Sequence, residues 1–312
     1  MEYLQPIIES VVANVQKVIQ GKEAVIRQAV SCWIAGGHIL FEDVPGTGKT
    51  MLARALAKSI DAPTARIQFT PDLLPSDIVG TSIFAKDKGQ FVFLPGPLFT
   101  TVLLADEINR ATPRTQSALL EAMSEGQCTA EKKTHKLPAN FLVIATQNPV
   151  EQQGTFPLPE AQLDRFMMRI ALGYPANLDE KKIVRSQLLS HPIDALSPVV
   201  KESDWEAVRT WSRYVEVSDS VLDYAMDLVD QTRKDPRVAL PASPRATIAL
   251  IRCSQAYALQ RGHRYVKPDY IKRIAPAILV HRIALTAKAR LERVTPTDVL
   301  EDILRKVAVP IR

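Results

Sequence analysis

The 312-residue sequence predicts an α/β core built on a parallel sheet, followed by a smaller all-helical domain. Up to about residue 173, short continuous apolar runs alternate with helical patterns, as expected of strands that are buried on both faces. Beyond Gly173 the apolar residues recur at helical spacing, and the sequence indicates no convincing strand. We therefore expect an α/β domain over residues 1–173 and a helical domain over residues 174–312.

Residues 1–36 are expected to form helices, because apolar residues recur at helical spacing on both sides of Gly21. Short buried strands should then alternate with helices. The expected strands cover residues 38–43, 65–69, 101–105 and 140–145, and the helices between them cover 51–59 and 113–124. A strand, a crossover helix and a second strand form the repeating unit of a parallel sheet that has helices on its faces.

Two polar insertions interrupt this alternation. The segment 71–100 is rich in Pro, Gly and Asp, and its residues 82–84 and 91–93 are expected to pair as a hairpin. A second hairpin is expected at 126–138. The helical patterns of the second domain cover residues 179–190, 203–212, 218–233, 244–260, 267–278 and 297–307.

The composition, with 46% hydrophobic and 23% charged residues, is typical of a globular protein. The net charge of +5 permits nucleic-acid binding, but the basic residues are scattered and do not argue for it. Three widely spaced cysteines lack metal-ligand spacing, and the N-terminus has no secretion signal. The most apolar stretch, 29–41, is too short to cross a bilayer. We expect a cytoplasmic protein with free thiols and no membrane span.

The segment Glu42-Asp43-Val44-Pro45-Gly46-Thr47-Gly48-Lys49-Thr50 opens a helix directly after a strand pattern. Backbone N–H groups of such a turn, together with the helix N-terminus, favour phosphate. Lys49 is expected to reach the β- and γ-phosphates, and the Thr50 hydroxyl to coordinate Mg²⁺. Asp43 stands where the strict pattern has Gly, but the flanking strand and helix still favour nucleotide binding over a plain tight turn.

Two carboxylates, Asp106 and Glu107, follow the apolar strand at 101–105. In an open parallel sheet this strand end lies beside the phosphate loop. Asp106 is therefore expected in the Mg²⁺ shell, and Glu107 is expected to orient and deprotonate the attacking water. The alternative is an ordinary helix start with acidic residues in its first turn. The upstream phosphate loop favours the catalytic interpretation.

The next strand pattern ends at Asn148, whose amide could hold the attacking water in line, although Asn-Pro is also an ordinary turn starter. Arg165 lies near the end of the core, where it could project toward an adjacent subunit's nucleotide as an arginine finger. The alternative for Arg165 is a surface salt bridge with Asp164. A second arginine, Arg245, opens a helix of the second domain and could couple that domain to the γ-phosphate.

These features stand in the order of an AAA+ ATPase. The loop, Asp106-Glu107, Asn148, Arg165 and Arg245 correspond to its Walker A, Walker B, sensor 1, arginine-finger and sensor 2 motifs. The more specific strings lie at 107–111, 118–123, 145–149, 154–166 and 280–283. With them the chain closely resembles the MoxR family from about Val18 to Ile283, which is nearly its whole length.

The resemblance implies a homo-oligomeric, usually hexameric ring that binds ATP or ADP with Mg²⁺ and acts as a chaperone on protein complexes. A partner with a von Willebrand factor A domain is common in the family. The segment 71–100 would be the helix-2 insert and 126–138 the pre-sensor-1 hairpin, with 18–21 near the adenine. The residues expected to bind nucleotide are Val18, Ile19, Gly21, Pro45, Gly46, Thr47, Gly48, Lys49, Thr50 and Met51.

Departures from the family pattern are small. Asp43 replaces a Gly, and Pro241-Ala242 precede sensor 2 where Gly is common nearby; neither removes a catalytic group.

Two other functions compete with the chaperone ATPase. AAA+ helicases of the MCM type share the insert and the hairpin, and residues 131–136 include three lysines, so a nucleic-acid motor is the first alternative. No aromatic residue is interleaved with these lysines for base stacking, which argues against nucleic acid as a partner. A nucleotide switch that does not hydrolyse ATP is the second alternative. Glu107 and Arg165 argue against it, because a switch would be expected to lose one of them.

Overall fold

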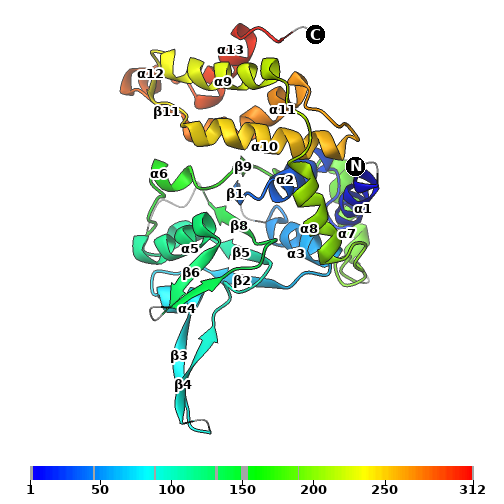
Figure 1. Cartoon of the computed structure of the whole chain (residues 1–312), viewed down its shortest axis with the longest axis vertical. Helices are drawn as coiled ribbons and strands as arrows, with labels where there is room; N and C mark the ends of the chain where they lie inside the picture. The colour runs from blue at the N-terminus through cyan, green and yellow to red at the C-terminus, as the bar shows by residue number, and fades with distance from the viewer. Residues whose placement is uncertain are drawn as a thin grey trace.

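The computed structural model describes residues 3–44, 46–87, 89–130, 133–148, 154–188 and 190–310. The chain has three tiers along its long axis (Figure 1). A helical region lies at one end and a parallel sheet flanked by helices lies in the middle. A two-stranded hairpin projects from the other end. Among the described residues, no helix is both long and apolar enough to span a membrane.

The central sheet has five parallel strands in the order β2-β5-β8-β1-β9. Their bounds are β1 (Ile39–Glu42), β2 (Thr64–Gln68), β5 (Val102–Asp106), β8 (Leu142–Gln147) and β9 (Met168–Ile170). The predicted parallel sheet is confirmed, and four of its strands were expected. The strand β9 was not, because three residues are too few to show a pattern.

Both faces of the sheet are buried, which explains the continuous apolar runs. Along β5, Val102 and Leu104 face one apolar cluster, whereas Leu103 and Ala105 face the other. The first cluster is covered by α1 (Leu4–Gln16), α2 (Glu23–Ile34) and α3 (Lys49–Ser59). The second is covered by α5 (Pro113–Glu125). This arrangement brings the carboxyl ends of the strands together at one edge, where α3 begins.

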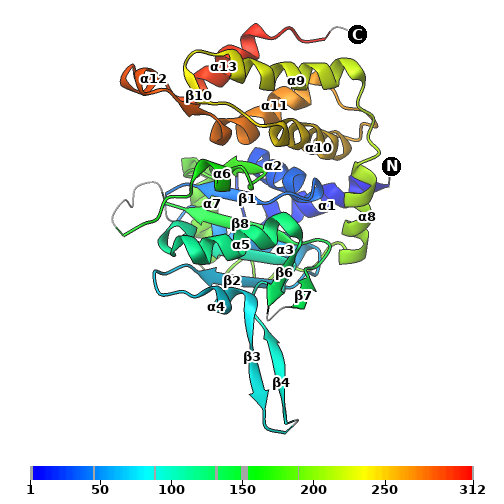
Figure 2. The ribbon, with the colours of Figure 1, turned by 60° about the vertical axis from the view of Figure 1, so that its left-hand side comes forward.

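The first insertion contains a short helix, α4 (Pro75–Val79), and the hairpin of β3 (Gly80–Ala85) and β4 (Gln90–Pro95). Figure 2 shows this hairpin pointing away from the sheet. The second hairpin pairs β6 (Gln127–Ala130) with β7 (Lys133–Lys136), and its expected residues Glu131 and Lys132 lie outside the described residues. The two insertions meet where the ring of His135 stacks on that of Phe93, with ring centroids 4.4 Å apart.

The region after residue 173 is mainly helical, as expected. Its helices are α7 (Asn177–Gln187), α8 (Glu202–Ser212), α9 (Asp219–Lys234), α10 (Pro244–Gln260), α11 (Pro268–Leu279), α12 (Ala287–Leu291) and α13 (Pro296–Lys306). The expectation of no strand there was wrong, because β10 (Val238–Leu240) and β11 (Ala284–Leu285) pair as an antiparallel ribbon. Strands of three and two residues are too short to give an alternating pattern.

The helix α8 lies along the side of the core in both views (Figures 1 and 2). Its Trp205 packs against Trp33 of α2, with ring centroids 5.1 Å apart, and both side chains are fully buried. The helices α9 to α13 form the upper tier, which we call the lid. The domain boundary at residue 173 stays a prediction, since helices beyond it contact both the core and the lid.

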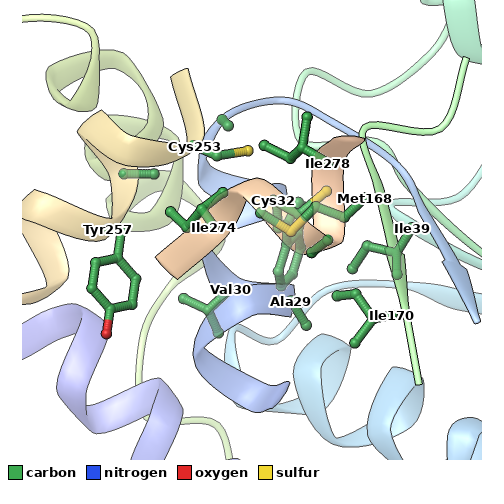
Figure 3. Packing of buried hydrophobic residues seen from close by; sticks show 14 of the residues in the cluster. Ala29, Val30, Cys32, Ile39, Met168, Ile170, Cys253, Tyr257, Ile274 and Ile278 are labelled. Atoms are coloured by element: carbon green, nitrogen blue, oxygen red, sulfur yellow. The ribbon is translucent and has the colours of Figure 1, made fainter. Parts of the chain in front are cut away.

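An apolar contact joins the lid to the core (Figure 3). Ile274 and Ile278 of α11 and Cys253 of α10 belong to the same buried cluster as Cys32 of α2 and Met168 of β9. The cysteines are free and buried, and burial raises the pKa of the Cys32 thiol well above its ordinary value. The lid is thus fixed to the core by close packing as well as by its chain connection.

Candidate nucleotide site

The phosphate loop connects the end of β1 to the first residue of α3. Gly46 and Gly48 have φ angles of 80° and 97°, in the left-handed region that favours glycine. A Cβ built at Gly46 would meet no atom within 4 Å, so the loop leaves open space on that side. Pro45, which was expected to contribute to the loop, lies outside the described residues.

The ammonium of Lys49 is hydrogen-bonded to the backbone at the start of this loop. Its Nζ donates to the carbonyl oxygens of Asp43 at 3.0 Å and Val44 at 2.8 Å. Burial lowers the pKa of Lys49, and the nearby carboxylates of Asp43, Asp106 and Glu107 oppose this effect. The lysine therefore faces the end of the sheet where the carboxylates gather.

A cavity of about 320 Å³ opens at the carboxyl edge of the sheet. It is lined by the phosphate loop, the start of α3 and the ends of β5 and β8, which contribute Gly46, Thr47, Gly48, Lys49, Thr50, Met51, Asp106, Glu107, Thr146, Gln147 and Asn148. The structure thus brings together six of the expected loop residues with Asp106, Glu107 and Asn148. Ligands of open parallel sheets bind at this edge.

Thr146 joins the two carboxylate residues. Its hydroxyl donates to Asp106 Oδ1 at 2.5 Å and accepts from the backbone N–H of Glu107 at 2.8 Å. Glu107 has φ 55° and ψ 49°, a conformation that non-glycine residues seldom adopt and that often occurs at functional sites. It precedes the short helix η1 (Ile108–Arg110), so the alternative of a regular helix start does not describe it. Sequence reasoning did not select Thr146, although it lies two residues before Asn148.

Three further side chains hold the carboxylates. Arg66 of β2 pairs with Asp106, with 2.7 Å between Nη2 and Oδ2, and Gln68 donates to Glu107 Oε2 at 2.6 Å. Arg110 lies 3.1 Å from the same oxygen of Glu107. Register explains the first two contacts: Gln68 pairs directly with Asp106 across the β2–β5 ladder, and Arg66 is on the same face two residues earlier. Polar residues alternate with apolar ones along β2, and this pattern was the signal that could have placed Arg66 and Gln68 on one face of the strand.

Two family models match the chain. The description of the first is "ATPase family associated with various cellular activities (AAA)", and it matches residues 38–168, which include the phosphate loop and both carboxylates. An AAA lid domain model matches residues 230–303.

Several relatives align along almost the whole chain. YeaC of Bacillus subtilis is 45% identical over 100% of this chain and 97% of its own length. Chaperone MoxR1 of Mycobacterium tuberculosis is 36% identical over 97% of this chain and 82% of its own. The chain belongs to the MoxR family of AAA+ ATPases. A crystal structure from Cytophaga hutchinsonii has 41% identity and a TM-score of 0.92, covering 99% of this chain and 96% of that one.

Asp43, the residue that departs from the strict phosphate-loop pattern, has a structural role in this MoxR protein. Its carboxylate accepts from the backbone N–H groups of Leu172 and Gly173 at 2.8 and 2.6 Å, and from that of Val44 at 2.8 Å. The contact ties the nucleotide loop to the segment that leaves β9. A Gly at this position could not make it.

The expected adenine segment lies close to the phosphate loop. A Cβ built at Gly48 would be 3.8 Å from the side chain of Ile19. Gly21 has φ 71°, in the region that favours glycine, and a Cβ there would collide with the Asp179 side chain of α7 unless that side chain moved. Val18, Ile19 and Gly21 do not line the phosphate cavity, and their role in binding stays a prediction.

The arginine-finger and sensor 2 candidates lie apart from the cavity lining. The guanidinium of Arg165 makes no hydrogen bond or ion pair with any residue that the structure describes, so it is not in a salt bridge with Asp164. That aspartate instead faces the lid. Its Oδ1 is 2.7 Å from Arg282 Nε, and its Oδ2 is 3.8 Å from Arg245 Nη1.

Proposed function

We propose that this chain hydrolyses ATP to ADP and phosphate with Mg²⁺, at a site that a neighbouring copy of the chain completes. One observation carries the proposal: the phosphate loop, Asp106, Glu107 and Asn148 line a single cavity. Gly-rich loop, acidic strand end and polar sensor are the parts that phosphoryl transfer to water requires. Membership of an ATPase family supports the same activity.

The residues present fit a bound Mg²⁺·ATP. The loop has open space at Gly46, Lys49 lies beneath it, and Thr50 and Asp106 offer a hydroxyl and a carboxylate oxygen to a hard cation. Thr50 and Asp106 would hold the Mg²⁺, which neutralises charge on the phosphates when bound. Lys49, which now donates to two carbonyl oxygens, would turn its ammonium to the β- and γ-phosphates.

Glu107 would act as the general base. Its carboxylate would accept a proton from the water that attacks the γ-phosphorus, and the Asn148 amide would hold that water in line. Glu107 now accepts from Gln68 and pairs with Arg110, both through Oε2, so its second carboxylate oxygen could accept from a water while these contacts hold the side chain. Thr146 would keep the backbone of Glu107 in place, because its hydroxyl accepts from the Glu107 N–H.

Charge spread over the transferring phosphoryl group needs a further cation. Arg165 is suited to supply it to the nucleotide of an adjacent subunit, since its guanidinium makes no hydrogen bond or ion pair with the described residues. Such a finger is worth about 10³ to 10⁵ in rate. Arg245, whose side chain is 58% exposed, is free to turn toward a γ-phosphate. We expect the ring to be a hexamer of identical chains.

The biological role that we propose is a cytoplasmic chaperone that matures or remodels protein complexes. It rests on similarity to relatives that include Chaperone MoxR1 and two proteins named MoxR. A protein client and a partner with a von Willebrand factor A domain are part of this proposal. The exposed hairpin of β3 and β4 would be available to either, because Phe84 and Phe91 at its far end are 54% and 72% exposed.

The substitution Glu107→Gln tests the proposal. It removes the base but keeps the size of the side chain, so ATP should still bind with unchanged affinity while turnover falls below detection. Phosphate release and calorimetric ATP titration measure the two effects. The matched control is Glu125→Gln, which changes a carboxylate at the end of α5 and should leave turnover unchanged. Turnover at the wild-type rate in Glu107→Gln would contradict the assigned role.

A further inference from the structure

One buried side chain of the lid binds residues 164–167, the segment that contains Arg165. Arg282, in the short helix η2 (Val280–Arg282), is only 2% exposed in its side chain. Its Nε donates to Asp164 Oδ1 at 2.7 Å, and its Nη2 donates to the carbonyl oxygens of Asp164 at 3.2 Å and Phe166 at 2.7 Å. Its Nη1 donates to the carbonyl oxygens of Met167 at 3.1 Å and Ile278 at 2.5 Å. An arginine has five N–H donors, and all of them are used.

The neighbouring His281 strengthens this contact. Burial and the adjacent Arg282 lower the pKa of His281 well below its ordinary value, so its imidazole is neutral. Its Nε2 lies 3.1 Å from the carbonyl oxygen of Phe166, to which it donates. The carbonyl groups of Asp164, Phe166 and Met167 are therefore all bound to η2.

Arg165 lies in the middle of this segment. On the core side, its backbone N–H donates to Gln162 and that of Met167 donates to His38, at 3.1 and 2.9 Å. The backbone around Arg165 is thus fixed from both sides, while its guanidinium makes no hydrogen bond or ion pair with the described residues. A side chain that must cross to another subunit needs a rigid base of this kind.

Asp164 also contacts the sensor 2 segment. Ser243 Oγ donates to its Oδ2 at 3.2 Å, and Arg245 Nη1 lies 3.8 Å from the same oxygen. The two arginines around Asp164 differ in burial, because Arg282 is 2% and Arg245 is 58% exposed. The first is a fixed partner, whereas the second can leave for a competing anion at small cost.

We propose that Asp164 and Arg282 are positioning residues for Arg165, and that Asp164 links the sensor 2 arginine of a subunit to the finger of that same subunit. A phosphate that draws Arg245 away removes one cation from Asp164, while Arg282 stays paired with it. The contact of Arg245 with a nucleotide phosphate and the position of Arg165, which would reach the neighbour's nucleotide, are thereby coupled within one chain. The inference rests on the proposed function, since it assumes that Arg165 acts on a neighbour's ATP.

The test is the variant Asp164→Asn, which keeps the size of the side chain and one oxygen for Arg282 but removes the charge. We expect kcat for ATP to fall at least about tenfold, a part of the full effect of a finger, with KM within about twofold of wild type. Arg282→Lys keeps a positive charge but can make at most three of the five hydrogen bonds, and it should give the same split between kcat and KM.

Mixing two kinds of variant subunit distinguishes a misplaced Arg165 from damage to the variant's own nucleotide pocket. Glu107→Gln subunits have an intact finger but no base, whereas Arg165→Ala subunits have an intact pocket but no finger. Asp164→Asn subunits should regain turnover when mixed with Glu107→Gln subunits, because their own pockets then receive a sound finger. They should regain none with Arg165→Ala subunits. Arg237→Lys, which alters the Arg237 pairs with Asp235 and Asp302 inside the lid, is the control and should keep wild-type kcat.

Two results would overturn the proposal. One is an unchanged kcat in Asp164→Asn. The other is recovery with Arg165→Ala but not with Glu107→Gln, which would place the defect in the variant's own pocket. Failure of the proposed function gives a different result, because Arg165→Ala would then turn over ATP at the wild-type rate. Thermal melting of each variant identifies any loss of kcat that comes from unfolding.

Discussion

The partly buried aspartates Asp106 and Asp164 are each paired with an arginine, and the two arginines differ strongly in burial. Asp106, in the nucleotide cavity, pairs with Arg66, whose side chain is 56% exposed. Asp164, at the contact between core and lid, pairs with Arg282, whose side chain is 2% exposed and makes five hydrogen bonds. Solvent screens the first pair, so a metal ion can replace the arginine at small cost. In the second pair the arginine is shielded from water, although the Asp164 side chain is 23% exposed, and this arginine fixes a backbone segment.

The two pairs suit different tasks. On the proposed function the partner of Asp106 would have to give way to a metal ion, and Arg66, Gln68 and Arg110 all reach the two carboxylates from positions where water can take their place. The partners of Asp164 and Phe166 have to keep their geometry while the rest of the site changes. An aspartate paired with an exposed arginine can exchange that partner, whereas an aspartate paired with a buried arginine keeps it. The burial of the arginine makes the difference.

The largest expected effect is on the buried pair. Replacing Arg282 with Met should lower the free energy of unfolding by about 3 to 5 kcal/mol, because Asp164 Oδ1 and the carbonyl groups of Asp164 and Met167 lose their arginine donor. The matched change Arg66→Met should cost less than about 1 kcal/mol, as is usual for an exposed pair. Urea unfolding without nucleotide measures both values. Equal losses of unfolding free energy in the two variants would contradict the larger contribution assigned to the buried arginine.

A smaller effect is expected from acidification, which should lower the free energy of unfolding through two buried histidines. Burial lowers the pKa of His38 to about 4 and that of His281 well below its ordinary value. Both histidines are neutral in the folded chain and regain an ordinary pKa when it unfolds, so stability is complete above pH 6.5 and falls as the pH drops toward 4. His38 alone should cost about 3 kcal/mol between pH 7 and 4.

Urea unfolding at a series of pH values checks this prediction. His38 accepts from the N–H of Val143 through Nδ1 and donates to the carbonyl of Met123 through Nε2. His38→Gln has one acceptor and one donor for these partners and does not titrate, so it should reduce the acid dependence by the same amount. A wild-type stability that stays constant down to pH 4.5 would contradict the assigned burial.

The sheet and the phosphate cavity could be predicted from sequence because each depends on neighbouring residues. A strand buried on both faces gives a continuous apolar run, as at 101–105, and the loop that follows β1 has a specific glycine pattern. The ends of parallel strands meet at one edge, so the sequence alone was enough to place Asp106, Glu107 and Asn148 together.

The remaining features depend on contacts between distant parts of the chain. Asp164 and Arg282 are 118 residues apart, and no local pattern relates them. Asp43 could be read only as a departure from a motif, because its partners Leu172 and Gly173 follow β9, a strand too short to predict. Arg66 and Gln68 read as polar residues of an edge strand until the register of β2 and β5 placed them beside the carboxylates.

ATP turnover per subunit with Mg²⁺, measured over a wide range of protein concentration, tests whether the site is shared between subunits. Sizing of the protein at each concentration accompanies it. We predict that turnover rises steeply with concentration, in step with ring assembly, because on the proposed function Arg165 would reach a nucleotide only across an interface. Substantial turnover that stays constant while sizing shows single subunits would contradict the shared site, because one chain would then be sufficient.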